Sequence, residues 1–231
     1  VLEYTKIINR YSMRKILWLN PKGGSGKTTL AITLASYYAQ AGYATTLVDH
    51  DPQGSSAYWL KQRSELEPAI QGLRACRILG NATRSFQQRG LLGADRVVLD
   101  GPAGLRGAAL TELLRQADRL IIPVMPTLLD LAATADFIAE LKRIQRVSVP
   151  RLQVGMVLNR VRPGVTVPDL EAKLRELAVP YLSYFNDAPV YLQAISAGSG
   201  LFELNNRDAL EEQQRWLPVL RWLGDAPPTA A

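Results

Sequence analysis

Cysteine and histidine are almost missing from this chain, which has one of each among its 231 residues. Cys76 alone cannot form an internal disulfide bond, and with a single histidine, His50, the chain has too few ligands for a Cys/His metal site. Such cysteine usage is typical of a reducing cytoplasm. Long apolar runs are missing as well, because Pro123 and Pro126 interrupt even the run from 120 to 129. We therefore expect no membrane-spanning helix, and the N-terminus shows no secretory signal.

The composition favours one globular domain. A chain of this length with 47% hydrophobic residues can bury a sizeable core, and no linker-like stretch divides it. We expect this domain to span residues 13–224, followed by a tail at 225–231. Residues 1–12 precede a plausible start at Met13 and are interpreted as an extension or a disordered arm. A basic DNA-contacting arm using Lys6 and Arg10 is the alternative.

A glycine-rich stretch from Asn20 to Thr29 lies between an apolar run, 16–19, and a segment with helical periodicity that Gly42 ends. Glycines allow the backbone to wrap around an anion, so that successive N–H groups and the helix N-terminus point at phosphates. In such a loop Lys27 reaches the β- and γ-phosphates and the Thr28 hydroxyl binds Mg²⁺. The expected nucleotide-binding residues are Gly23, Gly24, Ser25, Gly26, Lys27, Thr28 and Thr29. The alternative is a glycine-rich turn without a ligand.

The rest of the chain alternates apolar strands with amphipathic helices, which predicts a doubly wound α/β fold with a mostly parallel sheet covered on both faces. We expect Tyr58, Trp59 and Leu60 to be partly buried, and Pro218 to kink or split the last helix. The expected strands after the first are 44–48, 71–75, 96–100, 119–124, 152–158 and 181–183. The expected helices are 55–63, 82–88, 106–116, a long one after Pro126, 168–177 and 208–223.

Three aspartates lie at or just after the ends of expected strands, where ligands of doubly wound sheets bind. Asp49 and Asp51 lie in the run Asp-His-Asp-Pro-Gln-Gly, and Asp100 ends the run Val-Val-Leu-Asp. The last run looks like a Walker B strand, whose aspartate helps to hold Mg²⁺. Local roles are the alternatives: Asp51 would head a turn, and Asp100 would cap the turn after its strand.

The sequence resembles the ParA/MinD family of ATPases. The run K-G-G-S-G-K-T-T departs from the plain phosphate-loop pattern and carries an early lysine, Lys22, as in the deviant Walker A motif of that family. The runs L-V-D-H-D-P-Q-G-S, V-V-L-D-G-P and I-I-P-V-M-P-T-L-L-D-L follow in an order similar to the small ParA-type partition ATPases. The late stretch Ser199 to Glu203 is also similar to these ATPases. Several motifs in order are more specific than any one of them.

This resemblance implies ATP hydrolysis with ATP and Mg²⁺ as cofactors, in an ATP-sandwiched homodimer in which Lys22 acts in trans. It assigns Asp51 to the attacking water, and Asp49 and Asp100 to the surroundings of Mg²⁺. Phosphoryl transfer to water depends mostly on positioning and charge neutralisation. Asn159 stands where an asparagine often reads the adenine edge in this family, although an ordinary turn residue is the equal alternative.

Partition or positioning of a plasmid, a chromosome region or a protein cargo is the function that the resemblance implies. It also implies non-specific DNA binding, a ParB-like or cargo-adaptor partner that stimulates hydrolysis, and a cytoplasmic, nucleoid-associated location. DNA contacts would be made to phosphates. The candidate cations are Lys142, Arg143, Arg146, Arg151, Arg160, Arg162, Lys173 and Arg175.

Rival functions remain within the same fold. A MinD-like ATPase on a membrane surface would use an amphipathic C-terminal helix, but the apolar residues of the last helix, Trp216 and Leu220 among them, are better explained by core packing. A small-molecule ligase would keep the phosphate loop. The lone cysteine excludes a reductase resembling the nitrogenase iron protein. Two features depart from the family pattern: His50, and the pair Asn186 and Asp187.

Overall fold

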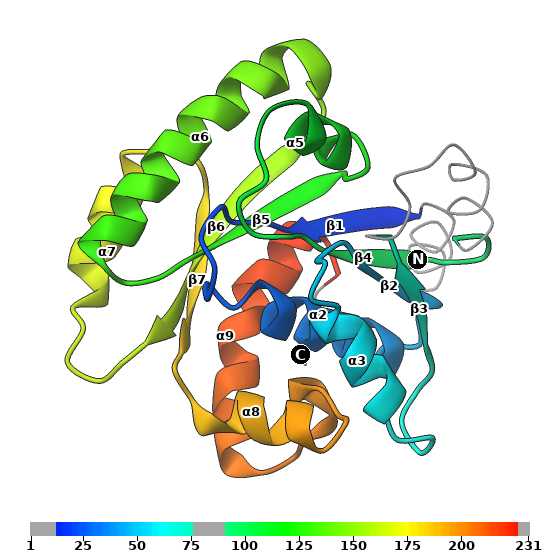
Figure 1. Cartoon of the computed structure of the whole chain (residues 1–231). Helices are drawn as coiled ribbons and strands as arrows, with labels where there is room; N and C mark the ends of the chain where they lie inside the picture. The colour runs from blue at the N-terminus through cyan, green and yellow to red at the C-terminus, as the bar shows by residue number, and fades with distance from the viewer. Residues whose placement is uncertain (1–12, 76–90, 226–231) are drawn as a thin grey trace, which may run out of the picture.

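A seven-stranded parallel sheet organises the molecule (Figure 1). The computed structural model describes residues 13–75 and 91–225. Within them the strands are β1 (Arg14–Trp18), β2 (Thr45–Asp49), β3 (Ile70–Arg74), β4 (Arg96–Asp100), β5 (Arg119–Val124), β6 (Gln153–Val161) and β7 (Tyr181–Asn186). They lie in the order β3-β2-β4-β1-β5-β6-β7, and each neighbouring pair is parallel. The predicted doubly wound sheet is confirmed.

Helices cover both faces of the sheet, as Figure 1 shows. One face carries α2 (Lys27–Gln40), α3 (Ser55–Gln62), α8 (Pro189–Ser196), the short η1 (Leu201–Glu203) and α9 (Arg207–Leu223). The other carries α5 (Gly107–Leu114), α6 (Leu128–Ser148) and α7 (Val167–Arg175). Strands buried on both faces read as continuous apolar runs, which explains the sequence of β1, β4 and β5.

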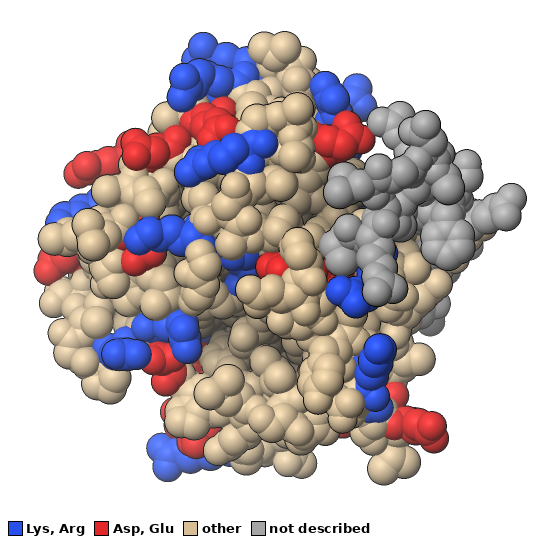
Figure 2. Space-filling view, in the orientation of Figure 1, with Lys and Arg blue, Asp and Glu red and all other residues tan. Residues whose placement is uncertain are grey.

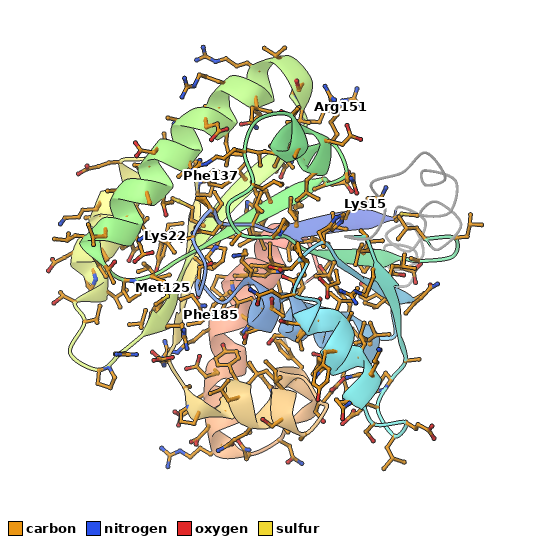
Figure 3. The ribbon with its side chains drawn as sticks, viewed as in Figure 1. Lys15, Lys22, Met125, Phe137, Arg151 and Phe185 are labelled. Atoms are coloured by element: carbon orange, nitrogen blue, oxygen red, sulfur yellow. The ribbon has the colours of Figure 1, made fainter. Side chains whose placement is uncertain are left out.

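Two hydrophobic cores result, one on each face of the sheet. Aromatic residues dominate the first: the Trp216 ring lies 4.6 Å from Phe185 and 5.8 Å from Trp18 between centroids. Phe137 of α6 is fully buried in the second core. Figure 3 labels Phe137 and Phe185, which lie on opposite faces of the sheet. Trp216 and Leu220 are also fully buried, so core packing explains the apolar side of α9, as expected.

Some local expectations were wrong. Tyr58 is 68% exposed, whereas Trp59 is 3% exposed, because neighbours on one helical turn point in different directions. The α9 helix continues through Pro218, which lies on its exposed side, so the expected split is wrong and the kink stays a prediction. Asp225, which we placed in the tail, is buried against the sheet. The predicted helix at 82–88 and the tail beyond Asp225 lie outside the described residues.

The sheet reverses its direction of winding at β1. From β1 the chain passes through α2 to β2 on one side, and from β5 it passes through α6 to β6 on the other. The carboxyl end of β1 therefore lies between connections that leave in opposite directions, which is where open α/β sheets bind ligands.

Candidate functional site

The loop between β1 and α2 forms the centre of the site. Gly24 and Gly26 have φ angles of 77° and 86°, a left-handed conformation that suits glycine. A Cβ on Gly26 would lie 2.1 Å from Nδ2 of Asn159, so no side chain fits there. Asn20 fixes the start of the loop, because its amide donates to the carbonyl of Pro123 at 2.6 Å and accepts from the Lys22 N–H at 2.8 Å. These contacts give the loop a defined shape.

Lys27 places a positive charge in this loop. Its side chain is almost buried, and its ammonium donates to the carbonyl of Lys22 at 3.1 Å. Burial lowers the pKa of Lys27, while the negative charges of Asp100 and Asp51 oppose that shift. A buried cation at the start of a helix is a binding site for an anion such as a phosphate. Lys27 is therefore placed where it could bind a phosphate, and its role toward the β- and γ-phosphates stays a prediction.

Asp100 ends β4 beside this loop and is fully buried. Burial raises the pKa of Asp100 to about 7, and the charges of Asp49 and Asp51 add to the shift. The hydroxyls of Thr28 and Ser56 act in the opposite direction, yet neither carboxylate oxygen has a hydrogen bond of good geometry. Buried oxygens without a partner fit a cation, and Mg²⁺ prefers oxygen ligands.

Asp49 and Asp51 organise the turn after β2. The carboxylate of Asp49 accepts hydrogen bonds from the N–H groups of Asp51 and Ala57, both at 2.9 Å. Asp51 accepts from the N–H of Gln53 at 2.9 Å, which is the turn role left open above. Of the two aspartates, only Asp51 also lines the cavity described next. Asp49 thus positions Asp51. The assignment of Asp49 to the surroundings of Mg²⁺ stays a prediction.

A cavity of 560 Å³ opens over the glycine-rich loop, a size typical of ligand sites. Of the predicted residues it brings together Gly23, Gly24, Gly26, Lys27, Thr28, Thr29, Asp51 and Asn159. The lining does not include Ser25, Asp49, Asp100 or Lys22. A second hollow of 630 Å³, among Lys142, Arg151 and Trp222, contains none of the predicted catalytic, nucleotide-binding or metal residues.

Asn159 is part of β6 rather than a residue after it, and it is 5% exposed. Its amide donates to the carbonyl of Ser25 at 2.8 Å and so supports the phosphate loop. The same amide lines the cavity, so both alternatives for Asn159 stay open at this stage.

A rim of charged residues at the cavity was missed by the sequence prediction. Asp187 pairs with Arg160 at 3.1 Å and with Arg162 at 3.0 Å. Although desolvation opposes it, these hydrogen bonds hold the pKa of Asp187 below its ordinary value. Arg160 has a φ of 58° and contacts the carbonyl of Gly24 at 3.4 Å. The one signal in the sequence was the unusual pair Asn186 and Asp187.

Lys22 points away from its own cavity. Its ammonium lies 3.1 Å from Asp130, near the start of α6, and its side chain is 40% exposed. In Figure 3 Lys22 lies at the opposite end of β1 from Lys15.

In the described residues no group of three or more His, Cys, Asp or Glu side chains could hold a metal by itself. A metal ion in the cavity over the glycine-rich loop would need further oxygen ligands from the bound molecule or from water.

Comparison with known proteins decides the family. The sequence model of the CobQ/CobB/MinD/ParA nucleotide binding domain matches residues 16–197. The chain belongs to this family. It is a P-loop ATPase of the ParA/MinD type, so the resemblance carried by the motifs is confirmed.

Three curated relatives are similar to this ParA-type chain over most of its length. It is 32% identical over 215 residues to the "Maintenance of carboxysome distribution protein A" of Gloeobacter kilaueensis, covering 91% of this chain and 86% of the relative. Its identity to the Halothiobacillus neapolitanus protein of the same name is 30%, covering 81% and 86%. The "Chromosome-partitioning ATPase Soj" of Thermus thermophilus is 31% identical, covering 72% and 77%.

Solved structures agree on the fold. The ATP complex of a Cyanothece McdA variant matches with a TM-score of 0.74 and 16% identity, covering 95% of this chain and 99% of that one. MinD of Pyrococcus horikoshii with Mg-ADP matches with a TM-score of 0.67 and 21% identity, covering 87% and 93%. At this identity the likeness shows the P-loop fold alone. No described helix is both apolar and long enough to cross a membrane.

Proposed function

We propose that this chain binds ATP with Mg²⁺, forms a dimer around the nucleotide, and uses hydrolysis to switch non-specific DNA binding while it positions a cargo. Lys27 and the loop amides hold the phosphates, and the Thr28 hydroxyl and Asp100 hold the ion, which neutralises charge that develops during transfer. Asp51 lines the cavity where it can orient a water molecule. The names of the curated relatives support a cargo, either a large protein assembly or a chromosome region. An adaptor that stimulates hydrolysis is part of the same proposal.

The position of Lys22 is the observation that carries this proposal. Its backbone carbonyl faces its own site, where it accepts from Lys27, but its side chain points out toward α6. A lysine on the phosphate loop whose ammonium points away from its own cavity can reach the phosphates of a second copy once its ion pair with Asp130 breaks. Leu192 on the cavity rim and Leu128 and Leu129 on α6 are 64%, 68% and 77% exposed, which suits a surface that a second copy covers.

DNA contact is proposed for the cations at the end of α6. Figure 2 shows Lys and Arg side chains at the top of the molecule, over that end of the helix. Arg146 and Arg151 make no ion pair with a described carboxylate, whereas Arg160 and Arg162 are engaged by Asp187 and Arg175 by Glu171. Arg146 and Arg151 are therefore better placed for phosphates than these three paired arginines, and nucleoid association would follow.

Binding to random-sequence duplex DNA tests the proposal. We expect binding with ATP but not with ADP or without nucleotide, and weaker binding at higher salt. Lys27→Ala removes nucleotide binding, and Lys22→Ala keeps it but weakens dimer formation and so lowers DNA binding and hydrolysis. Lys61→Ala, which removes an exposed lysine of α3, is the matched control. ATP hydrolysis with no DNA binding in any nucleotide state would overturn the DNA-dependent part.

A further inference from the structure

The ion pair between Lys22 and Asp130 joins the phosphate loop to the start of α6. Nζ of Lys22 lies 3.1 Å from Oδ1 of Asp130, and the side chains are 40% and 17% exposed. The lysine is thus held within its own subunit while its carbonyl accepts from Lys27. Lys22 therefore connects the nucleotide cavity to α6 through one residue.

Asp130 is fixed in place by the cap of α6. Thr127 is the N-cap residue, its hydroxyl accepts from the N–H of Asp130 at 3.1 Å, and it also bonds the carboxylate of Asp130. A negative charge in the first turn of a helix is favoured by the helix dipole. The acceptor for Lys22 is thus oriented before any partner or ligand arrives.

The surroundings of this ion pair decide whether it favours or opposes dimer formation. Leu128 and Leu129 precede Asp130 and are 68% and 77% exposed. If a second copy covers them, Lys22 must leave Asp130 to reach the partner's phosphates. Asp130 is then a carboxylate without its cation, close to an apolar surface, which costs free energy.

We propose that Asp130 is a positioning residue that retains Lys22 in its own subunit and opposes ATP-dependent dimerisation until the pair breaks. This inference rests on the proposed function, because it requires Lys22 to act across a dimer. Beyond that function, Asp130 is an ion-pair partner of Lys22 within the same subunit, and it lies outside the nucleotide cavity. Breaking this pair costs free energy that dimer formation must supply.

Asp130→Asn tests the retention. The amide keeps the shape and can still meet Thr127, but it loses the charge. With a slowly hydrolysed ATP analogue, analytical ultracentrifugation should show a dimer dissociation constant lowered about two- to fivefold, the range expected for a pair this exposed. Asp136→Asn removes one exposed charge from the same helix and should leave the constant unchanged. An unchanged or raised constant in Asp130→Asn overturns the proposal.

A double-mutant cycle separates retention from a structural effect on α6. In a Lys22→Ala background the Asp130→Asn change should have no effect on the residual dimer constant, because the pair is already absent. Asp130→Glu, which keeps the charge, should restore most of the wild-type constant. An equal effect of Asp130→Asn with and without Lys22 would mean that the residue acts only through the helix.

The monomer gives a readout that does not depend on assembly. Reductive ¹³C-methylation keeps the lysine charge, and the Lys22 signal is identified by its loss in Lys22→Ala. In nucleotide-free protein this signal should shift in Asp130→Asn and not in Asp136→Asn. A shift without tighter dimerisation overturns the retention and leaves the proposed function standing. If Lys22→Ala leaves dimerisation and hydrolysis intact, the proposed function fails, and the inference fails with it.

Discussion

The side-chain amide of Asn159 donates a hydrogen bond to the backbone carbonyl of Ser25 at 2.8 Å, across 134 residues of sequence. The contact joins β6 to the phosphate loop, and it places the same amide 2.1 Å from where a Cβ of Gly26 would lie. The loop is therefore shaped by a strand that follows it by most of the length of the domain.

Replacing Asn159 with Ala tests which part of the nucleotide this residue serves. Loss of the bond to Ser25 should weaken ATP binding by about 1 kcal/mol, or roughly fivefold, in calorimetric titrations. If Asn159 also reads the adenine edge, the ratio of ATP to GTP affinity should fall. Equal losses for ATP and GTP would leave Asn159 with the loop-supporting role alone.

The raised pKa of the buried Asp100 carboxyl group makes the unfolding free energy depend on pH. Burial raises its pKa from 3.8 to about 7, so the folded protein holds a proton that the unfolded chain releases. The stability contribution is present at low pH and is lost as the pH rises through 7. Without Mg²⁺ and nucleotide, Asp100→Asn should raise the unfolding free energy at pH 8 by about 1 to 4 kcal/mol, and much less at pH 4. A gain that is independent of pH, or one matched by the exposed Asp136→Asn, would contradict this account.

Arg96 and Asp225 form a fully buried ion pair at 2.6 Å, and the hydroxyl of Tyr38 donates to the same carboxylate at 2.9 Å. Asp225→Asn should cost about 3 to 5 kcal/mol in urea unfolding, because it leaves the guanidinium without its counter-ion. Asp208→Asn, in the exposed first turn of α9, is the control and should change stability by less than 0.5 kcal/mol, roughly the range of surface substitutions. A cost below about 1 kcal/mol for Asp225→Asn would show that water or a rearrangement compensates.

Gly200 packs directly against α2. A Cβ there would lie 1.7 Å from Oγ of Ser36 and 2.4 Å from its Cβ, so Gly200→Ala must displace η1 or the helix. We expect a loss of about 1 to 3 kcal/mol in unfolding free energy. Gly23→Ala, where an added Cβ meets nothing within 4 Å, should cost much less. Equal losses in the two variants would mean that the close packing at Gly200 is not responsible.

Much of the fold could be predicted from the sequence because apolar runs, turn residues and helix periodicity are local signals. The strand β6 was predicted to end at 158 but continues to Val161, since polar residues at the end of a strand look like a turn. The helix α8 was missed, because its eight residues follow directly on β7 and carry too short a pattern. The error in β6 falls at the end of an element, where pairing with a neighbour decides the boundary.

The candidate site was predictable to the extent that its residues lie in one motif. Lys27 and the glycines act through the local backbone, so their spacing alone indicates a phosphate loop. Asp187 and Arg160 come from other segments and meet on the cavity rim through the pairing of β6 with β7, which local patterns do not specify.

The sequence by itself determined the family, the parallel α/β sheet and the phosphate loop, because each rests on residue types at fixed local spacing. The tertiary structure decided the rest. It buried Asp100 without a hydrogen bond of good geometry, joined Asp225 to Arg96, and turned the side chain of Lys22 to Asp130 instead of its own cavity. Each of these depends on which segments meet in space, since burial and charge pairing are properties of the assembled fold and not of a local pattern.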